Sequence, residues 1–360
     1  MTGLVADAAA DPATTDPAVA ELVCTGWSAL SGLGVGRAEC TAGVLAGRSG
    51  LAGLDTAGPF TEAALVPGFS AAEALGRKGT RSMDRVTALA VSTVGQLLAD
   101  CGPSVTADPS RLGLVLGTGS GSVQSIMDFT RDSLTGDKPF HVDPARFPNT
   151  VMNKAAGQSA IWHGIKGPNT TIAGGWLTGL LALSYAVRIY RAGRCDRVLC
   201  GAAEEYSEQR AWLEWHTGTR TPLGEGGAVF LLESAESAAA AGRTAVARVL
   251  GTRFGAYGDA ADAGPALASC VRGALVSAGV AARDVAVVAP LGADEEAALD
   301  LPAARFVHGR SLFGDTSAAA TGLHMAAALA VLERSPSGSL ALVTGIDRDG
   351  TVGCALLGRP

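Results

Sequence analysis

The fold of this chain is decided by the stretch GPNTTIAGGWLTGLLAL (Gly167–Leu183), which predicts a strand, a glycine turn and a helix in direct succession. The strand is expected at 170–172, the turn at 174–175 and the helix at 176–191. A helix N-terminus carries unpaired N–H groups and the positive end of the helix dipole, which would activate a thiol there. Trp176 occupies this position, and an indole has no nucleophilic lone pair to offer.

Length and composition indicate a large cytoplasmic α/β protein. The chain has 360 residues, of which 48% are hydrophobic and only 17% charged, with a net charge of −6. This charge argues against nucleic acid as a partner, and no apolar run reaches the roughly 20 residues that span a membrane. Residues 1–20 lack the basic and apolar regions of a signal peptide, so we expect a disordered tail there. Seven cysteines without CxxC spacing predict neither a disulfide framework nor a metal site.

Short apolar strands alternate with helices along the rest of the chain, which is typical of a layered α/β fold with buried sheets. The last two expected strands should pair with each other. Helices are expected at 85–101, 155–163, 266–278 and 316–333, and strands at 22–24, 112–116, 197–200, 227–233, 246–251, 285–289, 339–344 and 352–357.

The stretch around Trp176 resembles the nucleophile elbow of the β-ketoacyl synthases, a branch of the thiolase-like enzymes, in which position 176 is the acyl-accepting cysteine. The resemblance implies the thiolase-like layered αβαβα fold with two similar halves, here 21–235 and 236–360. Further segments match the family in the same order along the chain: Leu22-Val23-Cys24, Gly47-Arg48-Ser49-Gly50, Gly117-Thr118-Gly119, Phe147-Pro148-Asn149 with Asn153 and Gly157, and Gly224-Glu225-Gly226-Gly227-Ala228-Val229.

Two histidines complete the machinery of that family, and both are replaced in this chain. The first histidine loop falls at Pro290–Asp294 and places Pro290 at the histidine position. The second motif falls at Arg310–Thr316 and places Asp315 there. The family's histidines stabilise the enolate that forms on decarboxylation, whereas a carboxylate repels it. Together with Trp176, these losses leave no expected catalytic residue.

The histidines that are present do not restore the site. His216-Thr217-Gly218-Thr219 is similar to the first histidine loop, but it precedes Gly224 and is therefore out of family order. All five histidines are expected to be structural or surface residues, namely His141, His163, His216, His308 and His324.

Chains with these losses resemble the chain length factors of bacterial type II polyketide synthases. That resemblance implies a non-catalytic subunit, without a cofactor, that pairs with an active ketosynthase. It also implies that the dimer interface forms a tunnel for the growing chain, which an acyl carrier protein carries. This chain departs from the family at two places. Familiar aromatic-polyketide members have glutamine where Trp176 stands, and active ketosynthases have a longer segment than 205–224.

The segment 122–131 aligns with the helix that gates tunnel length in chain length factors. Gln124, Met127, Asp128 and Arg131 share one helical face and are the candidate tunnel residues. An ordinary amphipathic interface helix would show the same spacing.

Two other functions of the chain stay open: a homodimeric acyl-binding or scaffolding pseudo-ketosynthase, and an acyltransferase with relocated chemistry, which needs a Ser or Cys beside a His.

Overall fold

One mixed sheet runs through the molecule in the computed structural model, which describes residues 21–55 and 58–360. Its strand order is β12-β11-β13-β14-β10-β1-β9-β7-β5-β6, with β2 attached to β1. The tail expected at 1–20 lies outside the described residues. The strands are β1 (Leu22–Ser31), β2 (Gly34–Val35), β5 (Leu112–Gly117), β6 (Asn169–Ile172), β7 (Arg197–Glu204), β9 (Gly226–Ser234), β10 (Ala247–Ala256), β11 (Val285–Ala289), β12 (Arg305–Phe306), β13 (Leu340–Asp347) and β14 (Thr351–Gly358).

The strand order repeats, which confirms the two similar halves. In the first half, β1 is antiparallel to β9 and β9 to β7, whereas β7, β5 and β6 are parallel. In the second half, β10, β14, β13, β11 and β12 follow the same scheme. The halves join where β1 and β10 pair at Val23 and Arg248. The expected division after residue 235 falls at the start of the linking helix α8 (Ala235–Ala240).

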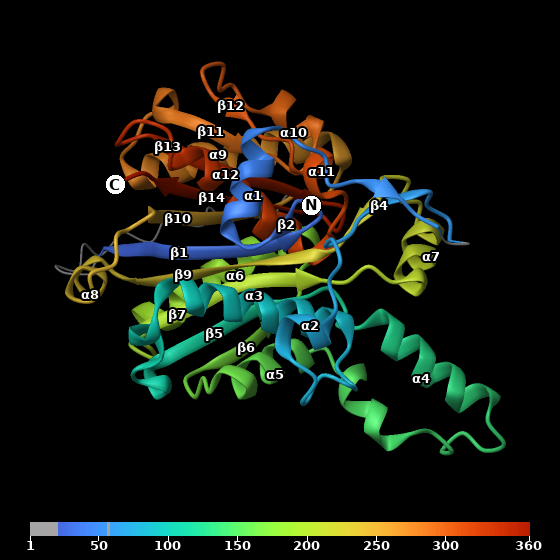
Figure 1. Ribbon diagram of the computed structural model, residues 1–360. Helices are drawn as coiled ribbons and strands as arrows, with labels where there is room; N and C mark the ends of the chain where they lie inside the picture. The colour runs from blue at the N-terminus through green and yellow to red at the C-terminus, as the bar shows by residue number, and fades with distance from the viewer. Residues whose placement is uncertain (1–20, 56–57) are drawn as a thin grey trace, which may run out of the picture.

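Helices cover both outer faces of these half-sheets and fill the space between them, which confirms the αβαβα layering (Figure 1). The central layer contains α6 (Thr178–Arg191) and α12 (Ala320–Leu332), and every residue of α12 is buried. A helix that is apolar all round belongs in such an interior. The outer layers contain α3 (Arg85–Cys101) and α5 (Lys154–His163) on one side and α9 (Ala263–Ala278) on the other.

The predicted elements are all present, but several boundaries differ because tertiary contacts set them. β1 continues to Ser31 because β9 pairs with it as far as Leu30 and β2 pairs with it at Ser31. The helix expected from 316 begins at Ala320, after the 3-10 turn Ser317–Ala319. The sequence did not predict a small second sheet of β3 (Ala52–Gly53), β4 (Glu62–Ala64) and β8 (Leu223–Gly224).

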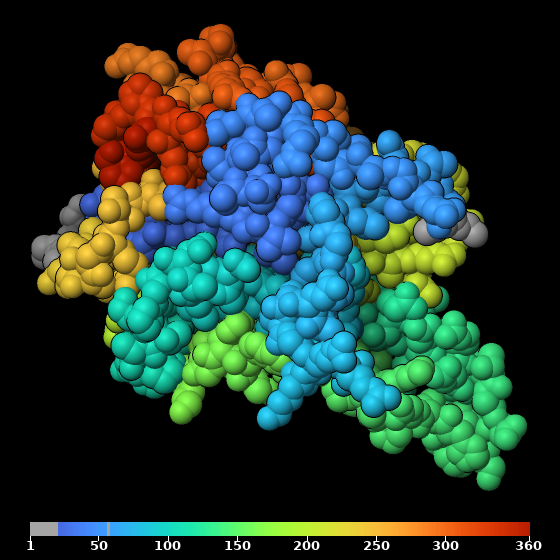
Figure 2. Space-filling view, viewed as in Figure 1, coloured from blue at the N-terminus to red at the C-terminus, as the bar shows by residue number. Residues whose placement is uncertain are grey.

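An arm made of residues 122–152 projects from the body of the molecule (Figures 1 and 2). It consists of α4 (Val123–Thr135) and a return segment that ends in the 3-10 turn Pro144–Thr150. None of the helices in the described part of the chain is long and apolar enough to cross a membrane. The remaining helices are α1 (Arg37–Leu45), α2 (Ala71–Leu75), α7 (Glu208–His216), α10 (Ala293–Ala298) and α11 (Gly309–Phe313).

Candidate functional site

The elbow between β6 and α6 has the sharp turn that the sequence predicts. Gly175 has a φ of +53°, and a Cβ atom there would lie 2.1 Å from Asp347 Oδ2, so both the backbone and the space require glycine. The Thr178 hydroxyl closes the turn, since it accepts from the Gly174 N–H at 3.0 Å and donates to the Gly175 carbonyl at 2.7 Å. A 3-10 turn over Gly175–Leu177 therefore precedes α6, which begins two residues later than predicted.

Trp176 is half-buried, and its backbone and indole are both held by hydrogen bonds. Its backbone N–H donates to Asp347 Oδ2 at 2.5 Å, and its indole Nε1–H donates to Asp315 Oδ1 at 3.1 Å. The guanidinium carbons of Arg310 and Arg348 lie 4.5 and 5.3 Å from the centre of the ring. The N–H that would stabilise a thiolate at this position is therefore already bound to a carboxylate.

Of the other two degenerate positions, one contacts this tryptophan and the other immediately precedes Leu291, which lines a cavity together with Trp176. Asp315 is buried and contacts the indole directly. Pro290 directly follows β11 and is buried, and its carbonyl faces the ring of His324 on α12. Burial and the nearby charge of Arg310 lower the pKa of His324 to about 4, so this histidine is neutral at neutral pH. Trp176 and Asp315 are thus in contact and Pro290 lies just after the end of β11, and none of the three positions supplies a thiol or an imidazole.

A cavity of about 410 Å³ lies beside the indole. No serine, cysteine or histidine is among its lining residues, so it contains no Ser–His or Cys–His pair. Four charged side chains line the cavity: the buried Glu295, the exposed Asp294 and the two arginines. The lining residues are Trp176, Tyr257, Ala260, Ala263, Gly264, Leu291, Gly292, Asp294, Glu295, Arg310, Ile346 and Arg348.

None of the seven free cysteines has the properties of a displaced nucleophile. Burial raises the pKa of Cys195 to about 11 and that of Cys200 well above its ordinary value of 9.0. Reactive thiols require the opposite shift. Within the described residues, no group of three or more His, Cys, Asp or Glu side chains is arranged to hold a metal ion.

The four candidate tunnel residues lie on α4 in the projecting arm. Asp128 connects two of the others, because it accepts from Gln124 Nε2 at 2.6 Å and from an Arg131 guanidinium nitrogen at 2.7 Å. Met127 is 52% exposed in the single chain. The structure therefore places these residues on one partly exposed helical face of the arm.

Sequence reasoning missed Glu205, which holds the N-terminus of α4. Its carboxylate accepts from Ser122 Oγ at 3.1 Å and from the Gln124 backbone N–H at 3.2 Å, and it also accepts from the Val86 N–H at the start of α3. Burial raises the pKa of Glu205 to about 7. No local motif points to this role, because the contacts join segments that are about 80 residues apart in the chain.

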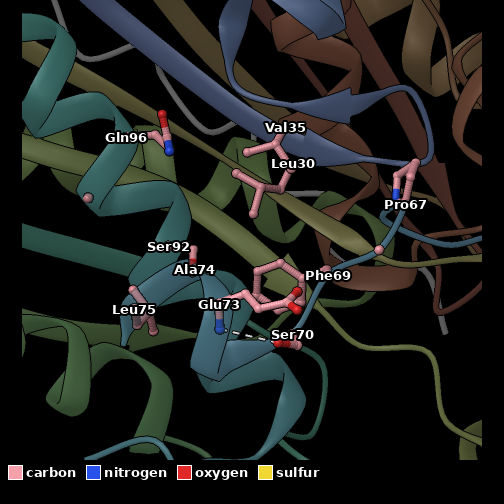
Figure 3. Close-up of a pocket in the computed structure, with 12 residues that line it drawn as sticks. Leu30, Val35, Pro67, Phe69, Ser70, Glu73, Ala74, Leu75, Ser92 and Gln96 are labelled. Carbon is pink, nitrogen blue, oxygen red and sulfur yellow. Dashed lines mark hydrogen bonds between the residues drawn. The ribbon is translucent and has the colours of Figure 1, made fainter. Parts of the chain in front are cut away.

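A second cavity of about 490 Å³ lies between β1, β2, α2 and α3 (Figure 3). Its lining is mixed: Leu30, Val35 and Phe69 are apolar, whereas Glu73 on α2 and Ser92 and Gln96 on α3 are polar. Its lining contains no cysteine, histidine, lysine or arginine. This cavity therefore has neither a catalytic pair nor a cation, and the elbow stays the better candidate site.

Comparisons with known proteins agree with this geometry. The family model "Beta-ketoacyl synthase, N-terminal domain" matches residues 19–222, more than half of the chain. The 3-oxoacyl-(acyl-carrier-protein) synthase 2 of Vibrio cholerae serotype O1 is 30% identical over 265 residues, which are 66% of this chain and 63% of that protein. The matched part of this chain thus spans less than two thirds of the length of that relative. The enzyme of the same name from Coxiella burnetii is 27% identical over 326 residues, covering 82% of this chain and 77% of its own.

Solved structures give the same assignment. The structure described as "The ishigamide ketosynthase/chain length factor" is 42% identical, with a TM-score of 0.88, and the match covers 94% of this chain and 99% of that one. A β-ketoacyl synthase from Burkholderia phymatum STM815 is 22% identical and shares the fold, with a TM-score of 0.82 over 95% of this chain and 100% of its own. With its elbow and its repeated strand order, this chain belongs to the β-ketoacyl synthase family.

Proposed function

We propose that this chain is the non-catalytic chain length factor subunit of a type II polyketide synthase. The observation that carries the proposal is the elbow itself: its backbone turn is retained, but the apex residue is Trp176, whose N–H groups are bound to Asp315 and Asp347. The cavity beside it offers no nucleophile–base pair, which speaks against an acyltransferase with relocated chemistry.

The surface next to the elbow supports a ketosynthase partner. β6 is an edge strand that pairs only with β5 within the described residues, so its outer edge is available to another strand. The neighbouring arm exposes large apolar side chains, of which Leu134 is 80% accessible. Exposed apolar surface of this kind is typical of protein interfaces. The other exposed apolar residues of the arm are Met127, Phe140, Phe147, Val151 and Met152.

The same arm supports a role in chain length. In our proposal, α4 presents Gln124, Met127, Asp128 and Arg131 to a tunnel that closes when the partner covers the arm. The hydrogen-bonded series of Gln124, Asp128 and Arg131 is polar, which suits keto-bearing intermediates better than a fully reduced chain. An acyl carrier protein would deliver the chain to the partner's cysteine, in the cytoplasm.

Co-expression with a Cys-bearing ketosynthase from the same gene cluster tests the partnership. We expect a complex with one copy of each chain, and we expect Phe147→Glu on the arm to weaken it. Val276→Glu is the matched control, because Val276 is 79% exposed on α9, in the opposite outer layer. A stable homodimer that does not bind the co-expressed ketosynthase would refute the proposal and favour a scaffolding pseudo-ketosynthase.

The tunnel role has a separate test in the reconstituted synthase. Met127→Trp narrows the proposed lumen, so we expect shorter products at an unchanged rate of chain initiation. Phe140→Trp changes another exposed apolar residue of the arm that lies in the return segment after α4, and it serves as the control. An unchanged product length in Met127→Trp would leave α4 as an ordinary interface helix.

A further inference from the structure

We propose that the cavity beside Trp176 binds a small organic oxyanion, meaning a carboxylate or a phosphate monoester on a short apolar body. The site is lined by Trp176, by Arg310 and Arg348 as the cations, and by apolar side chains. It uses none of the family's catalytic groups, since those are replaced in this chain.

The two arginines supply hydrogen-bond donors that the protein itself does not use. Both guanidinium groups lie over the indole of Trp176, at 4.5 and 5.3 Å from its centre, so they lie within roughly 10 Å of each other. Within residues 21–55 and 58–360, the guanidinium group of Arg310 makes no ion pair or hydrogen bond, and that of Arg348 makes only a 3.5 Å contact with Glu214. Guanidinium groups bind carboxylates and phosphates through paired N–H donors.

In the described part of the chain, no carboxylate around the cavity forms an ion pair with Arg310 or Arg348, and most of these carboxylates accept hydrogen bonds from other groups. Asp315 and Asp347 each accept one N–H of Trp176 and one further backbone N–H. Glu295 accepts two backbone N–H groups and one hydroxyl. Asp294 is exposed to solvent at the mouth. The cavity therefore has guanidinium donors that no lining carboxylate binds, which favours a ligand that brings acceptor oxygens.

The apolar lining and the volume of the cavity determine which kind of group can carry the anionic head of the ligand. Tyr257, Leu291 and Ile346 contribute apolar lining to the cavity, and the Tyr257 hydroxyl is already bound to the Asp347 carbonyl at 2.5 Å. A volume of about 410 Å³ is within the usual size range of small-molecule sites. A short alkyl or aryl chain with one anionic head fits both the size and the polarity.

Calorimetric titration of the full chain, alone or in its complex, tests the site with three probes that share one alkyl body: butyrate, butyl phosphate and 1-butanol. We expect at least one of the two anions to bind and the neutral alcohol not to bind. Binding of butyrate alone, butyl phosphate alone or both identifies the head group. If neither anion binds at about 10 mM, or if butanol binds equally well, the proposal is wrong.

Matched variants locate the binding. Arg310→Gln should lower the affinity roughly tenfold or more, whereas Arg220→Gln should not change it. Arg220 is a suitable control because it also stacks on a tryptophan, Trp215, at 3.9 Å, but does not line the cavity. The indole N–H signal of Trp176, assigned with Trp176→Phe, should shift on titration. Equal affinity in both arginine variants, or an unmoved indole signal, would overturn the assignment. These outcomes do not depend on whether a ketosynthase partner binds.

Discussion

Trp176→Cys restores the family's nucleophile to the elbow, and the structure predicts that it costs stability without restoring activity. The substitution removes the indole hydrogen bond to Asp315 and both arginine contacts. A hydrogen bond to a charged group contributes about 1.5–3 kcal/mol, and each partly exposed cation–π contact about 0.5–1 kcal/mol. Full truncation of a completely buried tryptophan costs about 3–5 kcal/mol. Because Trp176 is only half-buried, we expect a loss of about 3 kcal/mol.

Trp176→Phe separates the ring from its N–H group. It keeps an aromatic face for Arg310 and Arg348 and loses only the bond to Asp315, so we expect a loss of about 1.5 kcal/mol. Trp212→Phe is the control, since Trp212 is 40% exposed on α7 and makes no hydrogen bond through its indole within the described residues; a change below about 0.5 kcal/mol is expected.

Urea unfolding gives the stabilities, and product formation gives the activity. The activity is measured in complex with a ketosynthase whose own catalytic cysteine is changed to alanine. Condensation should stay absent in Trp176→Cys, because Pro290 and Asp315 still cannot stabilise an enolate. Wild-type stability in Trp176→Cys would refute the packing argument. Condensation in this background would refute the claim that the chemistry is lost.

Three further predictions follow from the same contacts. The purified chain should show no stoichiometric acylation by acyl carrier protein thioesters in intact-mass measurements, and a single-site adduct would contradict this. Burial raises the pKa of Glu205 from 4.5 to about 7, so between these pH values the folded state keeps a proton that the unfolded chain has lost. The free energy of unfolding should therefore fall as the pH rises from 4.5 to 7. An equally steep fall in Glu205→Gln would show that this carboxyl group is not the cause. A Cβ at Gly179 would lie 2.4 Å from the Gly322 nitrogen, so Gly179→Ala should separate α6 from α12 and lower the free energy of unfolding by about 1–3 kcal/mol. In the control Gly157→Ala on α5, the new Cβ has nothing within 4 Å, and we expect an increase of about 0.5–1 kcal/mol. Equal effects of the two substitutions in urea unfolding would refute the close contact.

The sequence by itself determined the class of fold and the position of the elbow. Strand and helix periodicity is local information, and the glycines before Trp176 show where the chain must turn sharply. The family motifs occur in order, so the replaced positions 176, 290 and 315 could be recognised without coordinates. The start of the elbow helix differs from the predicted residue 176. The helix begins at Thr178 because the Thr178 hydroxyl and Asp347 hold the preceding turn.

Only the tertiary structure decided what surrounds Trp176. Asp347, Arg310 and Arg348 lie more than 130 residues away along the chain, and no local pattern shows that they meet at one indole. The same holds for Glu205, which caps α4 from another strand end. Periodicity reports which face of an element is buried, but long-range contacts depend on how whole elements pack. The cavity and its arginine donors therefore depend on how the two halves of the chain pack together, which the sequence does not show.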